Sequence, residues 1–169
     1  MIKTVLSYFL MFVLLILVQV LVFNHIALFS IAIAFIFIYF IISLPLSLST
    51  NLLLLLSFAT GFIVDVFSDT PGVNSLSCTI LAILKRPVFY AYVPRDDKTK
   101  VMNPTIMTIG WAAYSKYLFT MCAIYSLLVF SIEYFSFADV KDILIMSLGA
   151  TLFTFIVNLA LGCIFDRKG

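Results

Sequence analysis

The sequence predicts an all-α polytopic membrane protein, with six transmembrane helices in one integral membrane domain over residues 1–169. The first observation is composition: 64% of the 169 residues are hydrophobic and only 11% are charged, whereas about half of a soluble domain is apolar. The second is that the chain from Thr4 to Val64 contains no Lys, Arg, Asp or Glu. The third is length, because charge-poor stretches approach the roughly 20 residues that a helix needs to cross a bilayer. These stretches are apolar on every face, which disfavours a β-barrel.

The first half of the chain divides into three predicted spans, at 4–23, 28–44 and 51–67. The first span is longer than a signal-peptide core and is not followed by a small-x-small cleavage site, so we expect it to remain in the mature protein. Pro45 and the Ser/Thr/Asn cluster after it end the second span. The third span runs into Asp69-Thr70-Pro71-Gly72. Pro followed by Gly at the two central positions predicts a type II turn there.

The second half supplies spans at 75–92, 117–132 and 143–165. Asn74 or Ser75 is a suitable N-cap for the fourth span. Near its other end lie Lys85 and Arg86, whose long side chains can extend to the membrane interface. We expect residues 94–100 to form a solvated loop, and Pro104 to open a helix whose later part is the fifth span.

The basic residues predict that both termini lie in the cytoplasm. With this orientation the inner segments hold nine basic residues: Lys3, Lys85, Arg86, Arg95, Lys98, Lys100, Lys116, Arg167 and Lys168. Lys141 alone lies outside. The reverse orientation would violate the positive-inside rule almost completely.

Under this topology, polar residues gather near the outer leaflet. Gln19, Asn24 and His25 form one predicted cluster at the end of the first span, and Asp65 lies in the outer third of the third span. One interpretation is that Asp65 hydrogen-bonds to Gln19 or to the backbone of the turn after its helix. The other is a functional contact, because an ionised carboxylate in a membrane span costs roughly 2.5 to 3.5 kcal/mol. Asp69 would share its helix face if the helix continued that far, which like charges oppose.

Several classes of function are disfavoured. His25 is the only histidine, so a two-histidine zinc motif is impossible and a serine-hydrolase triad is improbable. The GxGD motif of aspartyl intramembrane proteases is absent. We therefore expect no enzyme activity, no metal and no cofactor. The net charge of +2 is too small to indicate nucleic-acid binding.

Two further features concern contacts. Asn158, within the sixth span, is expected to hydrogen-bond to a neighbouring helix. The hydrophilic loop that contains Arg95, Asp96, Asp97 and Lys98 is the largest predicted cytoplasmic surface for a soluble partner.

The third span and its turn resemble the signature of the rod shape-determining protein MreD family. The residues that carry the resemblance are Gly61, Asp65, Thr70, Pro71 and Gly72. It extends along most of the chain, through NHIALF, GFIVDVFSDTPG, the PRDD loop, FSFADV and a basic C-terminus. One departure is that many members have another residue between the Pro and the Gly of the turn.

The resemblance implies a non-enzymatic scaffold of the bacterial elongation machinery in the plasma membrane. Such a protein binds MreC, a single-span protein with a periplasmic domain, and works with MreB, RodA and a penicillin-binding transpeptidase in lateral peptidoglycan synthesis. Residues Gly61, Asp65, Asp69, Thr70, Pro71 and Gly72 would then form a partner-binding or structural motif. The resemblance also implies a fold similar to the six-helix substrate-binding subunits of energy-coupling-factor transporters. A small-molecule-binding subunit, with a pocket near Gln19, Asp65 and His25, is therefore the alternative.

Overall fold

The computed structural model describes residues 2–23, 34–93, 103–133 and 140–166. The helices are α1 (Ile2–Val18), η1 (Gln19–Phe23, a π-helical turn), α2 (Ile38–Ser43), α3 (Thr50–Ser68), α4 (Val73–Tyr92), α5 (Ile106–Ile109), α6 (Trp111–Glu133) and α7 (Val140–Asp166). The described part of the chain contains no strand. The predicted all-helical fold is thus confirmed over these residues.

Three of the described helical segments are long and apolar enough to cross a membrane: Thr50–Ser68, Trp111–Glu133 and Ile143–Phe165. The apolar segment Leu6–Val22 is shorter. Helix α4 has 20 residues, but Lys85, Arg86 and Pro87 interrupt its apolar character. The chain therefore has the helices of a membrane protein, while the six-span count and the orientation stay predictions.

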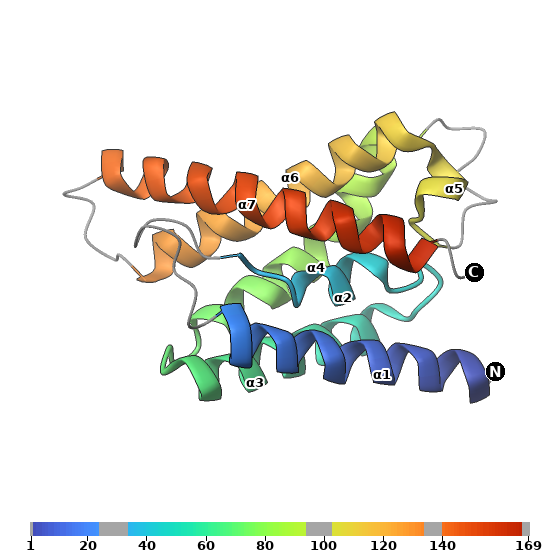
Figure 1. Cartoon of the computed structure of the whole chain (residues 1–169), viewed down its shortest axis with the longest axis horizontal. Coiled ribbons are helices and arrows are strands. Elements are labelled where there is room, and N and C mark those ends of the chain that lie inside the picture. The colour runs from blue at the N-terminus through green and yellow to red at the C-terminus, as the bar shows by residue number, and fades with distance from the viewer. Residues whose placement is uncertain (1, 24–33, 94–102, 134–139, 167–169) are drawn as a thin grey trace.

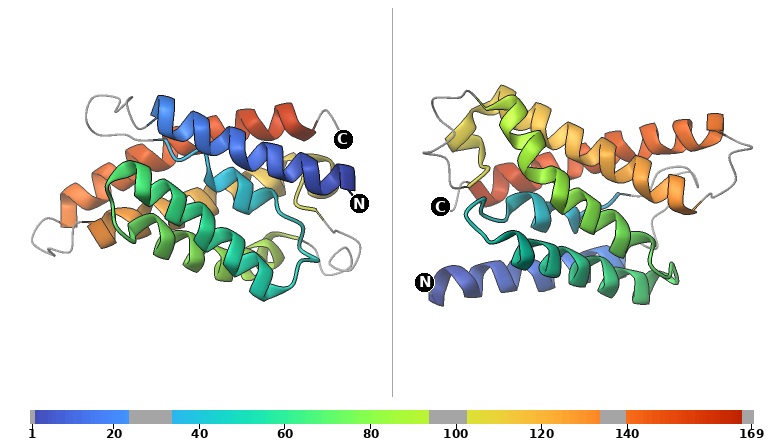
Figure 2. Two further views of the ribbon diagram at one scale, coloured as in Figure 1. Left: turned by 90° about the horizontal axis from the view of Figure 1, so that it is seen from below. Right: turned by 180° about the vertical axis from the view of Figure 1, so that it is seen from behind.

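The long helices form a bundle in which α3 and α4 run side by side as a hairpin (Figures 1 and 2). Helix α4 also packs on α6, and α6 packs on α7. The start of α1 and the end of α7 lie at the same end of the bundle (Figure 1). The α3–α4 turn, η1 and the end of α6 lie at the opposite end, which we call the turn end.

The core is rich in aromatic side chains from α6 and from the segment before α2. Tyr125 of α6 is fully buried, and its ring centroid lies 5.0 Å from that of Phe35 and 5.7 Å from that of Phe37. Both pairs meet edge to face, an arrangement that aromatic rings favour. This packing places residues 35–37 at the centre of the bundle rather than on its surface.

The prediction of one continuous helix over 28–44 is wrong in its described part. Residues 34–36 are not helical, and only Ile38–Ser43 form α2. No Pro or Gly marks the break. The non-helical backbone survives inside an apolar bundle because side chains from distant helices satisfy its polar groups, as described below.

The prediction of one helix from Pro104 to Ile132 also needs correction. The cap is Thr105, whose side chain and that of Thr108 form a capping box around α5. Gly110 has φ 80°, ψ 157°, so α5 ends there and α6 begins at Trp111. A positive φ of this kind is accessible to glycine at little cost.

Candidate functional site

Asp65 lies near the end of α3 and caps the start of the next helix. Its Oδ1 accepts hydrogen bonds from the backbone N–H of Asn74 at 2.9 Å, from the Asn74 amide at 3.0 Å and from the Thr70 hydroxyl at 3.1 Å. Its Oδ2 accepts from the Ser75 N–H at 2.8 Å and from the Ser75 hydroxyl at 2.5 Å. The residue is 5% exposed. Both oxygens are thus engaged within the protein.

This arrangement replaces an ordinary N-cap. The N-cap position of α4 is Gly72, which has no side chain to accept the free N–H groups of the first turn. Asn74 and Ser75 occupy the second and third positions, whose N–H groups a cap normally accepts. Asp65 supplies the acceptor from α3 instead, so one carboxylate both caps α4 and joins the two helices.

The turn between α3 and α4 has the predicted type II geometry. The N–H of Val73 donates to the Thr70 carbonyl at 3.3 Å, and Gly72 has φ 86°, ψ −10°. Helix α3 ends before it at Asp69, whose φ of 56° is left-handed. Asp65 and Asp69 therefore do not face each other on a continuous helix.

Gly61 lets α3 approach α4 closely, one helical turn before Asp65. A Cβ at this position would lie 2.5 Å from the Asn74 carbonyl oxygen and 2.6 Å from the Ser75 Cα. Both are backbone atoms, which cannot move aside without moving α4. The spacing Gly61-x3-Asp65 thus places the close contact and the cap on one face of α3.

A groove of about 690 Å³ lies along the outside of this hairpin. Its walls include three exposed apolar side chains, Phe58, Phe62 and Leu76. Between them lie Ser75 and Thr79, small residues spaced by four on α4. Small residues at this spacing let a further helix approach closely within a membrane.

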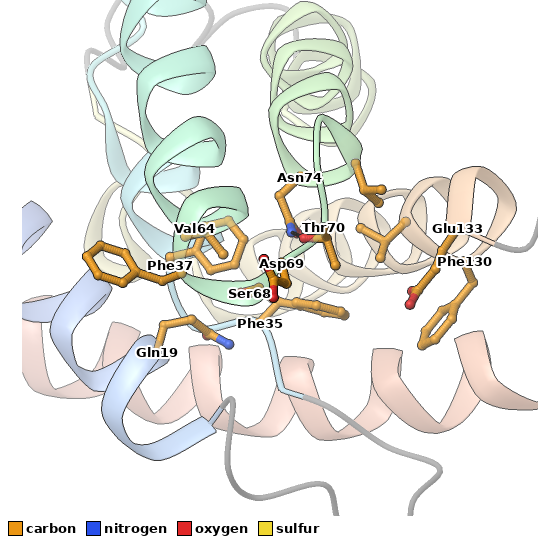
Figure 3. A pocket seen from close by; sticks show the side chains of 13 residues that line it. Gln19, Phe35, Phe37, Val64, Ser68, Asp69, Thr70, Asn74, Phe130 and Glu133 are labelled. Carbon is orange, nitrogen blue, oxygen red and sulfur yellow. Dashed lines mark hydrogen bonds between the residues drawn. The ribbon is translucent and has the colours of Figure 1, made fainter.

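A separate cavity of about 470 Å³ opens at the turn end (Figure 3). It lies between η1, the segment before α2, the α3–α4 turn and the end of α6. Its lining residues are Gln19, Phe35, Phe37, Val64, Phe67, Ser68, Asp69, Thr70, Val73, Asn74, Val129, Phe130 and Glu133. Asp65 does not line it, because its carboxylate faces α4.

The floor of this cavity includes the non-helical segment, held by polar side chains from η1 and α7. The Ile36 N–H donates to Gln19 Oε1 at 2.8 Å. The Phe35 N–H donates to the Thr154 hydroxyl at 3.1 Å, and the Asn158 amide donates to the Phe35 carbonyl at 3.1 Å. Asn158 thus donates to this non-helical backbone, and its side chain also interacts with Cys122 of the neighbouring helix α6, so the expected contact with a neighbouring helix is only part of its role.

At the far side of α2, Lys85 is fully buried and fastens the end of that helix to α4. Its Nζ donates to the carbonyl oxygens of Ile41 at 2.8 Å and Leu44 at 2.5 Å. The last carbonyl groups of a helix have no partner within the helix, and Lys85 satisfies two of them. The side chain therefore points into the protein, rather than outward to the interface as predicted.

The structure thus brings together some of the predicted site residues and not others. Gly61, Asp65, Thr70, Pro71 and Gly72 form one unit. Gln19 lies at the cavity and bonds to Ile36, not to Asp65 by any observed hydrogen bond. Asn24, His25, Arg95, Asp96, Asp97 and Lys98 lie outside the described residues.

Sequence reasoning considered Asn74 and Ser75 only as alternative caps and missed that both bind Asp65. It also missed Tyr125, whose hydroxyl donates to Asn74 Oδ1 at 2.5 Å and ties α6 into this network. One feature of the sequence pointed to this network. Gly72 immediately precedes α4 and has no side chain, so the acceptor for the free N–H groups of the first turn must come from another residue.

Over the described residues, the fold and site define an all-helical protein with helices long enough to span a membrane and one buried carboxylate, Asp65, whose hydrogen bonds are satisfied internally. No group of three or more His, Cys, Asp or Glu residues able to hold a metal occurs among the residues described. Comparisons with protein-family models, with curated proteins and with solved structures found no match.

Proposed function

We propose that this protein is a non-enzymatic membrane scaffold that binds the transmembrane helix of a partner in the α3–α4 groove. The observation that carries the proposal is the state of Asp65, both of whose oxygens accept hydrogen bonds inside the hairpin. An acid engaged in this way stabilises a surface and is poorly placed to act on a substrate.

The groove has the chemistry that a partner helix needs. Phe58, Phe62 and Val66 on one wall and Leu76 on the other are 49%, 55%, 62% and 50% exposed. Lipid chains also cover such side chains, but the small residues Ser75 and Thr79 between them favour close packing of a helix. A helix in this groove would contact the capped turn directly.

In the fuller form of the proposal, the chain has six spans with both termini in the cytoplasm of a bacterium and belongs to the MreD family. The partner is then the single-span protein MreC, and MreB, RodA and a penicillin-binding transpeptidase act in the same machinery. The motif that carries the resemblance, Gly61 to Gly72, overlaps the lining of the groove, which shares Asp65, Pro71 and Gly72 with it and extends on to α4. Lateral peptidoglycan synthesis and rod shape would depend on this contact.

The test is a pulldown of the tagged protein from native membranes in mild detergent, read by mass spectrometry. Phe62→Ala removes the centre of the groove wall, and Phe9→Ala is the matched control, because Phe9 is 60% exposed on α1. We expect a single-span protein to co-purify with the wild type and with Phe9→Ala and to be depleted with Phe62→Ala. Equal recovery by all three would refute the proposal.

The cavity at the turn end supports a second candidate, a small-molecule-binding subunit of a membrane transporter. Its volume of about 470 Å³ falls within the range of roughly 300 to 1,000 Å³ that is typical of ligand pockets. Co-purification of a transporter ATPase, with a stoichiometric small molecule, would favour this function over the scaffold.

A further inference from the structure

The cavity at the turn end has walls suited to one class of ligand. Four Phe side chains line it from three different segments: Phe67 is exposed, whereas Phe35 and Phe130 are largely buried and Phe37 is fully buried behind them. Figure 3 shows Gln19 and Phe37 on one side of the space, with Phe130 and Glu133 across from them. Aromatic faces carry negative electrostatic potential and attract cations.

The charged residues of the cavity also favour a cation, because they are acidic. Among its lining residues, Asp69 and Glu133 are acidic and none is Lys or Arg. Both acids are exposed and lie at the mouth, on the α3–α4 turn and at the end of α6. The carboxylates of the described lining would repel an anion that enters here and attract a cation.

The polar groups deeper in the cavity are held in place before any ligand arrives. Gln19 is bonded to Ile36, and Asn74 is bonded to Asp65, Thr70 and Tyr125. These side chains give the cavity a fixed polar edge beside its aromatic walls. A rigid pocket of this kind loses little entropy on binding.

We propose that this cavity binds a small organic cation, an amine or quaternary ammonium group attached to an apolar body. The aromatic walls enclose the apolar part, and the cationic group lies toward Asp69 and Glu133. A lipid with an ethanolamine headgroup and a free soluble amine share this chemistry. The inference goes beyond the scaffold role and does not depend on a partner in the α3–α4 groove.

The test uses the full chain in nanodiscs of phosphatidylglycerol, titrated with 4-fluorobenzyltrimethylammonium and followed by fluorine NMR. The probe 4-fluorobenzoate is the matched anion with a similar ring. We expect saturable binding of the cation and none of the anion. The double variant Asp69→Asn, Glu133→Gln should lower affinity roughly tenfold, because it removes both exposed charges from the mouth of the cavity.

Both substitutions are at exposed positions, and asparagine tolerates the left-handed backbone at residue 69, so folding should be unaffected.

Adding phosphatidylethanolamine to the nanodiscs distinguishes a lipid headgroup from a free soluble amine as the source of the cation. Displacement of the probe, with the lipid retained in native mass spectrometry, assigns the headgroup, and unchanged probe binding assigns a soluble cation. Absence of saturable cation binding, equal binding of benzoate or an unchanged affinity in the double variant would overturn the proposal. The Phe62→Ala pulldown tests the scaffold separately, because Phe62 does not line this cavity.

Discussion

Replacing Asp65 by Asn is the sharpest test of the helix-capping account. The carboxylate accepts five hydrogen bonds, three at Oδ1 and two at Oδ2. Asparagine keeps one carbonyl oxygen, with two lone pairs, and brings two N–H donors into a site that already consists of donors. Some three of the five donors therefore lose their acceptor within a buried site.

Losing an N-cap costs about 0.5 to 2 kcal/mol, and leaving a buried donor unsatisfied costs about 1 to 3 kcal/mol. These penalties overlap, so we expect Asp65→Asn to lower the free energy of unfolding by about 2 to 4 kcal/mol. The assay is equilibrium unfolding of the detergent-solubilised protein in sodium dodecyl sulfate, followed by circular dichroism.

The matched control is Asp69→Asn, the same chemical change four residues later. Asp69 is exposed, and its left-handed backbone suits asparagine, so this variant should unfold within about 0.5 kcal/mol of the wild type. If Asp65→Asn were as stable as Asp69→Asn, the carboxylate would not hold α3 to α4 and the reasoning would be refuted.

Three more predictions concern other contacts and use the same unfolding assay. Gly61→Ala should cost roughly 1 to 3 kcal/mol, because the new Cβ meets α4 backbone at 2.5 Å; Gly162→Ala, which meets only the end of the Tyr114 side chain, should cost less, and equal costs would contradict the close approach of α3 and α4. Asn158→Leu should cost roughly 1 to 2 kcal/mol by leaving the buried Phe35 carbonyl without its donor, whereas the exposed Asn51→Leu should have little effect; similar stability of both variants would argue against that contact. Lys85→Met should cost about 1 to 3 kcal/mol and speed amide exchange at the end of α2, because two carbonyl groups lose their donor; unchanged exchange would show that the lysine does not hold α2.

Features that depend on neighbours in the chain could be predicted from the sequence. A helix over the third predicted span, 51–67, is confirmed at Thr50–Ser68, and a helix at Val140–Asp166 contains the sixth predicted span, 143–165. The type II turn followed from Pro71-Gly72 alone, because these residues restrict the local backbone. Position 65 was recognised as unusual because an acid in an apolar helix needs a partner.

Features that depend on distant residues could not be predicted in the same way. Nothing in the local sequence of residues 34–37 marks a break in the helix. The break is stabilised by Gln19, Thr154 and Asn158, which come from segments far away in sequence. The sequence shows that these polar side chains lie in apolar spans and therefore need hydrogen-bond partners. It does not show which backbone segment supplies the partners. The partners of Lys85 are likewise distant in sequence. They are the carbonyl groups of Ile41 and Leu44 at the end of α2, which packs against α4.

The most direct test of the proposed scaffold is photo-cross-linking in living cells with p-benzoylphenylalanine at position 62, in the wall of the α3–α4 groove. The same probe at position 9, on the exposed face of α1, is the control. The proposal predicts a light-dependent adduct with one single-span protein from position 62 and none from position 9. No adduct from position 62, or the same adduct from both positions, would contradict the proposal that this groove binds a partner helix.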